Sequence, residues 1–262
     1  MPIGDYAKIG VNPFTKQKID ILSLGAFCPK PQGLPRLVLE PRKPRRGEDT
    51  ARVTRYGGAP LLDGKTRWPK GRRGPLTFVG QLDFAQLQKA HRGGLALPRE
   101  GILSVFYDVE RQPCGLEVGD ERSFATIYTP DPETAELRED DDEEDPIPLR
   151  VLDAAFEKKP ASDAGHHVGG DPDWIQSDER PFLQLAAAKL PMKLAGLEAA
   201  EAKGVDVVGT LKRSKEWRLL WQIDSDDVLF TWGDAGRLYV FIREADLKAG
   251  RFDQARHLLQ CF

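Results

Sequence analysis

Three short motifs occur twice in this chain, in the same order, and they constrain its fold more than any other feature. Each set has a Gly-Gly-x-Pro turn, an apolar stretch ending in Gln-(Leu/Ile)-Asp, and a Gly-x-Leu-x-Val-Phe stretch. The two copies are Gly57–Pro60 with Gly169–Pro172, Gln81–Asp83 with Gln222–Asp224, and Gly101–Phe106 with Gly236–Phe241. Motifs that recur in order indicate an internal duplication, with the unequal segments inserted as loops and helices. The alternative is that apolar strand ends resemble one another by chance.

Local patterns predict both strands and helices. The stretch Trp217–Phe241 reads as two strands joined by a turn-rich connection, and further strands are expected at 76–82, 102–109 and 123–129. Helices are expected at 84–90 after an Asp83 cap, around the Pro191 break within 181–203, and at 252–259. Because strands and helices do not alternate regularly, we expect an α+β fold. Its core would be a duplicated, mainly antiparallel sheet with peripheral helices and pseudo-two-fold halves.

The duplication sets the expected domain boundaries. We expect a single domain over 53–262, with one half at about 53–130, the other at about 165–262, and an acidic loop at 131–150 between them. Residues 1–52 are rich in proline and are expected to form an extended basic segment packed on the core. The seven consecutive carboxylates of 139–145 predict a mobile surface loop, since a calcium loop needs glycine and spaced ligands.

Charge and cysteine content exclude several classes of function. The 38 basic and 41 acidic residues give a net charge of -3, so no global field favours nucleic acid or an anionic membrane. The basic residues cluster locally, where either a phosphate-bearing or acidic partner or a solvated loop explains them, at Arg36, Arg42, Lys43, Arg45, Arg46, Arg52 and Arg55. The 3 cysteines fit neither a disulfide framework nor a metal knuckle. Without a signal peptide or membrane span, we expect a soluble cytoplasmic protein.

The joint pattern of these motifs resembles the YwqG-like family of bacterial domains of unknown function. The resemblance covers roughly 53–110 and 165–262 and rests on the repeated motifs together with Trp68-Pro69, Leu97-Pro98 and Trp232–Gly236. Membership implies a single α+β domain with duplicated halves, and no reaction. Some relatives lie near secreted toxins of bacterial competition, so the resemblance suggests an immunity role by analogy.

The paired Gln-x-Asp motifs give the first candidate site. Gln81 and Asp83 share one strand face, as do Gln222 and Asp224, so four polar groups could converge between the halves. Two carboxylates at short range would have separated pKa values and could act as acid and base. The alternative, which we favour, is structural: each Asp caps the next turn and each Gln fixes a loop.

A second candidate site is an apolar pocket. Trp68, Trp174 and Trp232, with Asp234, could line it and hold a small molecule, although Trp232–Gly236 also suits a tight turn between strands. His166 and His167 lie among aspartates, but adjacent residues of extended chain point in opposite directions, so we expect no metal site. Since no nucleophile motif or cofactor motif occurs, we expect no catalytic residue and no cofactor.

These features favour a cytoplasmic protein-binding module without catalysis, in its most concrete form an immunity-type protein that neutralises a bacterial toxin. A protein partner is therefore expected, and membrane or nucleic-acid partners are not. The alternatives are a hydrolase-like enzyme using Asp83 and Asp224, and a small-molecule sensor with a site between the two halves.

Overall fold

The computed structural model describes residues 2–11, 18–22, 24–139, 146–160, 165–226 and 230–262. The chain forms two compact units. The smaller unit comprises residues 1–30 and 177–217, and the larger unit comprises residues 31–176 and 218–262.

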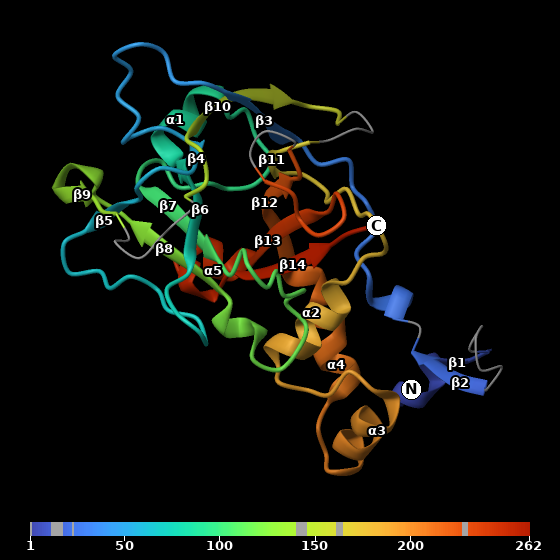
Figure 1. Cartoon of the computed structure of the whole chain (residues 1–262). Helices are drawn as coiled ribbons and strands as arrows, with labels where there is room; N and C mark the ends of the chain where they lie inside the picture. Colours follow the sequence, from blue (N-terminus) through green and yellow to red (C-terminus); the bar gives the residue numbers. More distant parts are fainter. Residues whose placement is uncertain (1, 12–17, 23, 140–145, 161–164, 227–229) are drawn as a thin grey trace. The chain divides into compact units, whose positions relative to one another are not determined.

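The larger unit contains a ten-stranded sheet with the strand order β14-β13-β12-β11-β3-β10-β4-β6-β7-β8 (Figure 1). The registered pairs in this sheet are antiparallel. Its strands are β3 (Arg36–Arg42), β4 (Arg55–Tyr56), β6 (Thr77–Asp83), β7 (Ile102–Tyr107), β8 (Phe124–Thr129), β10 (Arg150–Glu157), β11 (His167–Gly169), β12 (Trp217–Asp224), β13 (Arg237–Arg243) and β14 (Arg256–Gln260). A separate two-stranded sheet pairs β5 (Leu61–Asp63) with β9 (Ala135–Leu137).

The two edge strands of the large sheet approach each other, so the sheet is barrel-like and nearly closed. The Phe124 ring of β8 stacks on the His257 ring of β14 with centroids 5.0 Å apart. The Thr126 hydroxyl of β8 donates to the carbonyl of Phe252, in the turn that precedes β14. Curling the sheet in this way removes much of the exposed edge that a flat sheet would present.

Burial on both faces explains the nearly continuous apolar sequence of the central strands. In β6, the six residues from Phe78 to Asp83 are all buried. In the buried core of the larger unit, the Tyr56 ring of β4 stacks on the Trp221 ring of β12 with an interplanar angle of 4°. Gly80 makes room for this pair, because a Cβ there would lie 2.5 Å from the Arg55 carbonyl and 3.1 Å from the Trp221 ring.

Short helices connect the strands of the larger unit. Asp83 ends β6 and caps α1 (Phe84–Ala90) by accepting from the backbone N–H of Gln86. α5 (Glu244–Lys248) follows β13 directly. The 3₁₀ turns are η3 (Asp120–Arg122), η4 (Pro132–Thr134) and η6 (Phe252–Gln254).

The smaller unit is mainly helical and has its own core. Its elements are η1 (Ile3–Tyr6), β1 (Ala7–Val11), β2 (Lys18–Leu22), η2 (Leu24–Phe27), α2 (Arg180–Ala187), α3 (Leu194–Ala202), α4 (Val207–Lys212) and η5 (Arg213–Glu216). Ile3, Leu24 and Phe27 pack with apolar residues of the three helices in one buried cluster. Among the helices that the structure describes, none has the length and apolar character needed to cross a bilayer.

Several predictions from the sequence are confirmed, and the prediction for the C-terminal segment is wrong. The mainly antiparallel sheet, the strands at 76–82, 102–109 and 123–129, the Asp83-capped helix and the break at Pro191 are confirmed. The predicted helix at 252–259 is wrong: η6 ends at Gln254 and β14 pairs with β13. Sheet pairing there overrides the local helix propensity. Residues 140–145 of the predicted acidic loop lie outside the described residues.

Candidate functional site

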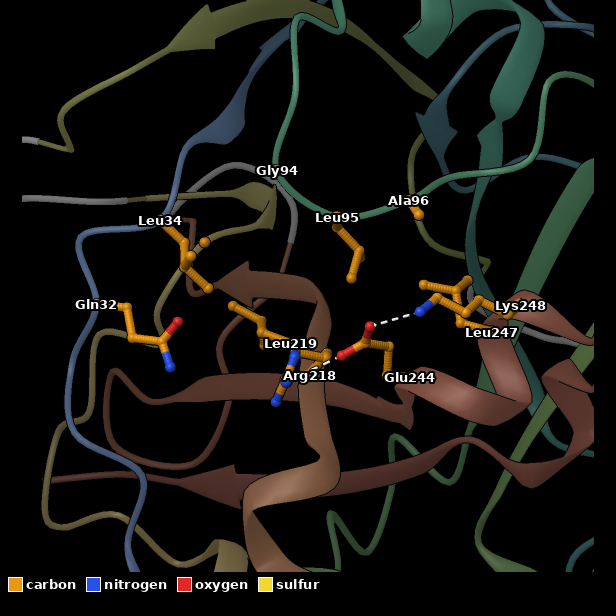
Figure 2. A pocket seen from close by; sticks show the side chains of 11 residues that line it. Gln32, Leu34, Gly94, Leu95, Ala96, Arg218, Leu219, Glu244, Leu247 and Lys248 are labelled. Atoms are coloured by element: carbon orange, nitrogen blue, oxygen red, sulfur yellow. Dashed lines mark hydrogen bonds and ion pairs between the residues drawn. The ribbon is translucent and has the colours of Figure 1, made fainter.

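A cavity of about 160 Å³ in the larger unit is the candidate site. Figure 2 shows the side chains around it. Three segments of the chain form walls of the cavity. They are the irregular segment that precedes β3, the loop that follows α1, and helix α5. Its lining comprises Gln32, Leu34, Gly94, Leu95, Ala96, Gly170, Arg218, Leu219, Glu244, Leu247 and Lys248. The cavity therefore brings the loop at 94–96, from the predicted first half, against residues of the predicted second half.

The wall before β3 is held by a single carboxylate. Asp171 Oδ2 accepts hydrogen bonds from the backbone N–H groups of Gln32, Gly33 and Leu34, at 2.8, 2.7 and 3.4 Å. A carboxylate that accepts several N–H groups fixes an irregular segment well, because charge strengthens each bond. Asp171 follows the Gly169-Gly170 motif directly, so the second Gly-Gly turn positions this wall.

The loop after α1 is held by the side chain of Gln88 in that helix and by the side chain of His91, its C-cap residue. His91 Nε2 lies 2.9 Å from the Leu95 carbonyl, and Gln88 Nε2 donates to the carbonyls of Leu97 and Pro98. Gly94 has φ +101°, and a Cβ there would lie 2.8 Å from the Pro35 carbonyl. Glycine thus allows the loop to approach the chain before β3 closely.

Apolar side chains form the interior of the cavity. Leu219 of β12 and Leu247 of α5 are buried, with exposures of 2% and 3%. In Figure 2, Leu34 and Leu95 point toward the space above Leu219. A small apolar group placed here would leave water, which is the main favourable contribution to ligand binding in such cavities.

An ion-pair chain borders the same space. Glu244 Oε2 lies 3.0 Å from Arg218 Nη2, and Glu244 Oε1 lies 2.7 Å from Lys248 Nζ. The hydrogen bond from Lys248 and the charge of Arg218 hold the pKa of Glu244 below its ordinary value. These three side chains are partly exposed, at 30%, 44% and 61% for Arg218, Glu244 and Lys248. The charged border is therefore open to solvent, unlike the apolar interior.

A second cavity, of about 170 Å³, lies between the two edge strands of the sheet. It is lined by Glu121, Phe124, Ala125, Thr126, Asp253, Ala255, Arg256 and His257. Burial lowers the pKa of His257 to about 4, and its Nε2 lies 3.2 Å from the Pro113 carbonyl. This histidine is thus a neutral packing residue at neutral pH, and the cavity lacks a leucine-lined interior like that of the first.

The four polar residues predicted as an inter-half site have hydrogen-bond partners that are separate for each pair. Gln81 Nε2 donates to the carbonyls of Ala51 and Val53, and Asp83 caps α1. Gln222 Nε2 donates to the Gly165 carbonyl. Asp224 Oδ1 accepts from the Ser225 N–H, and its Oδ2 accepts from Arg237 Nε at 3.0 Å. These hydrogen bonds fit the structural alternative, in which each Gln fixes a loop and each Asp caps a turn.

The aromatic residues predicted to line a pocket pack against different rings. Trp68 contacts Phe106, and its Nε1 donates to the Leu76 carbonyl. Trp174 stacks on Phe241. Trp232, beside the turn that contains Asp234, is 1% exposed and contacts Tyr107 and Phe230. Neither of the two cavities described above is lined by any of the four.

The two adjacent histidines are buried and take part in hydrogen bonds. His166 Nδ1 accepts from the Asp224 N–H at 3.1 Å, and His167 Nδ1 lies 2.8 Å from the Gly169 carbonyl. Burial lowers the pKa of both imidazoles, that of His167 to about 4. Within the described part of the chain, no group of three or more His, Cys, Asp or Glu side chains has an arrangement that could hold a metal ion.

Ion pairs account for much of the basic cluster. Arg42 pairs with Glu48 and Asp153, and Arg52 pairs with Glu133. Arg36 pairs with Glu157, and Arg55 is 1% exposed and donates to the Thr50 carbonyl. Four of the seven basic side chains are therefore engaged within the protein.

Arg218, Glu244 and Lys248 were not candidates on sequence grounds. The Glu244–Lys248 spacing of four residues is a recognisable local signal, since such residues face each other on a helix. Arg218 is 26 residues from Glu244 in the chain, and only strand order brings them together. The sequence carries no local signal for that contact.

Comparison with protein families matches residues 54–261 to the family described as "Domain of unknown function (DUF1963)". The matched range begins one residue before β4 and ends one residue after β14. No curated protein matches the sequence.

Proposed function

We propose that this chain, which belongs to the DUF1963 family of unknown function, is a binding module for a small molecule. The observation that carries the proposal is the cavity bordered by Leu95, Leu219 and Glu244. It combines an apolar interior with a few charged groups at its border, the arrangement typical of small-molecule sites. The sensor alternative from the sequence thus becomes the favoured function.

The volume limits the ligand. A cavity of about 150 Å³ holds a molecule the size of benzene, and the cavity here measures about 160 Å³. We therefore propose a ligand whose buried part has about six non-hydrogen atoms.

A thermal-shift screen tests the proposal. A ligand that binds only the folded state stabilises it by about 2.7 kcal/mol at 100 times its Kd. We expect one or more small apolar acids, amides or alcohols to raise the melting temperature of the wild-type protein. Ala96→Trp should abolish the rise by filling the exposed border of the cavity. Ala199→Trp, an exposed position in α3, is the matched control and should keep it.

We also propose that the large sheet arose by internal duplication. The mirrored strand order supports this: β4-β6-β7-β8 at one end of the sheet corresponds to β11-β12-β13-β14 at the other. The positions of the helices do not follow this correspondence. In the mirrored order β6 corresponds to β12, but α1 follows β6 whereas α5 follows β13. Identification of the chain with the YwqG-like family likewise remains a proposal from its motifs.

The protein-binding, immunity-type role stays a prediction from the sequence. It was based on the lack of a catalytic motif together with local clusters of charge, one of which is the acidic run at 139–145, and residues 140–145 lie outside the described part of the chain. Likewise, cytoplasmic localisation and the alternative of an Asp83–Asp224 enzyme remain expectations.

A further inference from the structure

Gln32 gives the cavity of about 160 Å³ a neutral hydrogen-bonding group. It is one of the lining residues, and it is exposed. Its backbone N–H donates to Asp171 Oδ2 at 2.8 Å, and within the described part of the chain its side-chain amide has no hydrogen-bond partner. The amide therefore offers a carbonyl acceptor and N–H donors to water or to a ligand.

The backbone around Gln32 is fixed, so the position of its side chain is restricted. The Asp171 carboxylate also accepts from the N–H groups of Gly33 and Leu34, at 2.7 and 3.4 Å. In Figure 2, the side chains of Gln32 and Leu34 extend from this segment toward Leu219. An amide on a backbone that is held in this way loses less conformational entropy on binding a ligand than an amide on a mobile loop would.

The charged residues of the lining already have ion partners within the protein. Glu244 Oε2 lies 3.0 Å from Arg218 Nη2, and Glu244 Oε1 lies 2.7 Å from Lys248 Nζ. A charged ligand would lose hydration on entering the cavity and would compete with these pairs. A neutral polar group has a smaller hydration cost, and it can bind Gln32 without breaking an ion pair.

We infer that the cavity binds a small neutral carboxamide, whose amide pairs with the side chain of Gln32 and whose apolar body lies among Leu34, Leu95 and Leu219. A primary carboxamide has both a donor and an acceptor, so it can form two hydrogen bonds with the Gln32 amide. An apolar body of about six non-hydrogen atoms fits the volume of the cavity. This inference rests on the proposed function, because it assigns a ligand class and a specificity-determining residue to the same cavity.

Benzamide, acetophenone, benzoate and benzamidine are suitable probes, because they have the same size and shape and differ in their polar group. We expect titration calorimetry on the full chain to show the tightest binding for benzamide. Acetophenone should bind about threefold more weakly, because it keeps the carbonyl and lacks the N–H donors. Benzoate, an anion, and benzamidine, a cation, should bind at least about threefold more weakly than benzamide, because their charges must lose hydration.

Three variants assign the preference to Gln32. Gln32→Met keeps the length of the side chain without its amide, so benzamide should bind about threefold more weakly, as acetophenone does. Gln32→Glu has only acceptors and adds a negative charge, so benzamidine should bind to it more tightly than benzamide. Gln254→Met, at an exposed glutamine outside the lining, is the control and should bind benzamide as the wild type does. Because the Gln32 side chain is exposed, both of its variants should keep the wild-type melting temperature.

The outcomes distinguish the inference from the proposed function. Equal affinities for benzamide and acetophenone in the wild type, or an unchanged benzamide affinity in Gln32→Met, would overturn the role of Gln32 and leave small-molecule binding intact. Tighter binding of benzoate or benzamidine than of benzamide by the wild type, or a continued preference for benzamide in Gln32→Glu, would overturn the inference as well. If no probe binds at about 10 mM, the inference is wrong, because even modest contacts by about nine atoms should give binding there. Absence of any ligand in the thermal-shift screen would in addition contradict the proposed function.

Discussion

His166 and His167 are adjacent in the chain, and their imidazoles have different partners. His166 joins Tyr56 and Asp224, whereas His167 contacts the Gly169 carbonyl and lies 3.9 Å from Asp173. This is the alternation of side chains along extended chain, and it explains why a His-His pair in a strand is a poor metal site. At the residue scale, the alternation could be predicted, and the partners could not.

The buried histidines predict a loss of stability at acidic pH. Burial lowers the pKa of His167 and of His257 from 6.5 to about 4. The unfolded chain therefore binds protons that the folded chain does not between these values. Stability contributed by each neutral imidazole is complete above pH 6.5 and falls as the pH decreases toward 4, by at most about 3 kcal/mol each. Urea unfolding at a series of pH values measures this decline.

The variant His257→Phe is the control for this prediction. Phenylalanine keeps ring contacts with Phe124 and Tyr107 and removes one titrating group. Its free energy of unfolding should decline less steeply between pH 6 and 4.5 than that of the wild type. An identical slope would show that His257 is not the group responsible.

The two Gly-Gly turns illustrate how a short motif acts at the scale of an element. β4 leads into Gly57 and Gly58, and β11 ends at Gly169 before Gly170, all with positive φ. A Cβ at Gly57 would lie 1.9 Å from the Ile147 carbonyl. The motif thus predicts a turn correctly. The close approach of Ile147 to this turn depends on the tertiary structure, and the motif does not predict it.

Alanine substitutions at two glycines with nearly equal φ angles separate these two effects. Gly57 and Gly33 have φ +58° and +60°, and a Cβ at Gly33 has nothing within 4 Å. Gly33→Ala should lower the free energy of unfolding by about 1 kcal/mol, because alanine disfavours the left-handed backbone conformation. Gly57→Ala should lower the free energy of unfolding by roughly 2 kcal/mol more than Gly33→Ala does, because its Cβ would clash with the Ile147 carbonyl. Urea unfolding of both variants measures the difference, and equal losses would contradict the close approach.

Local patterns were sufficient for some elements and misleading for others. β6 and α1 could be predicted because an apolar strand and an aspartate cap are adjacent in sequence. The Pro-rich start was expected to lie over the core, yet β3 pairs with β10 and β11 within the sheet. Burial of Leu37 and Leu39 explains why this segment is a strand of the sheet. Pairing on both sides provides hydrogen-bond partners for the backbone N–H and C=O groups and removes the two side chains from water.

At the scale of the whole molecule, the two compact units predict separable stability. Phe27 is 2% exposed and belongs to the core of the smaller unit. Phe27→Ala should destabilise that unit by about 3 to 5 kcal/mol. Hydrogen exchange should then become faster in α2, α3 and α4, while β6 and β7 keep their protection. An equal increase in both units would mean that the chain unfolds as one cooperative system.

The mainly antiparallel sheet and the positions of the turns could be predicted from the sequence, because both depend on neighbouring residues. The hydrogen bonds of the two Gln-x-Asp motifs fit the structural alternative that the same local reasoning favoured. Tertiary contacts make the C-terminal segment an edge strand and bring Arg218, Glu244 and Lys248 to the border of one cavity. Those contacts join residues far apart in the chain. Their geometry follows from strand order and sheet curvature, which burial of the whole apolar surface selects and no local pattern encodes.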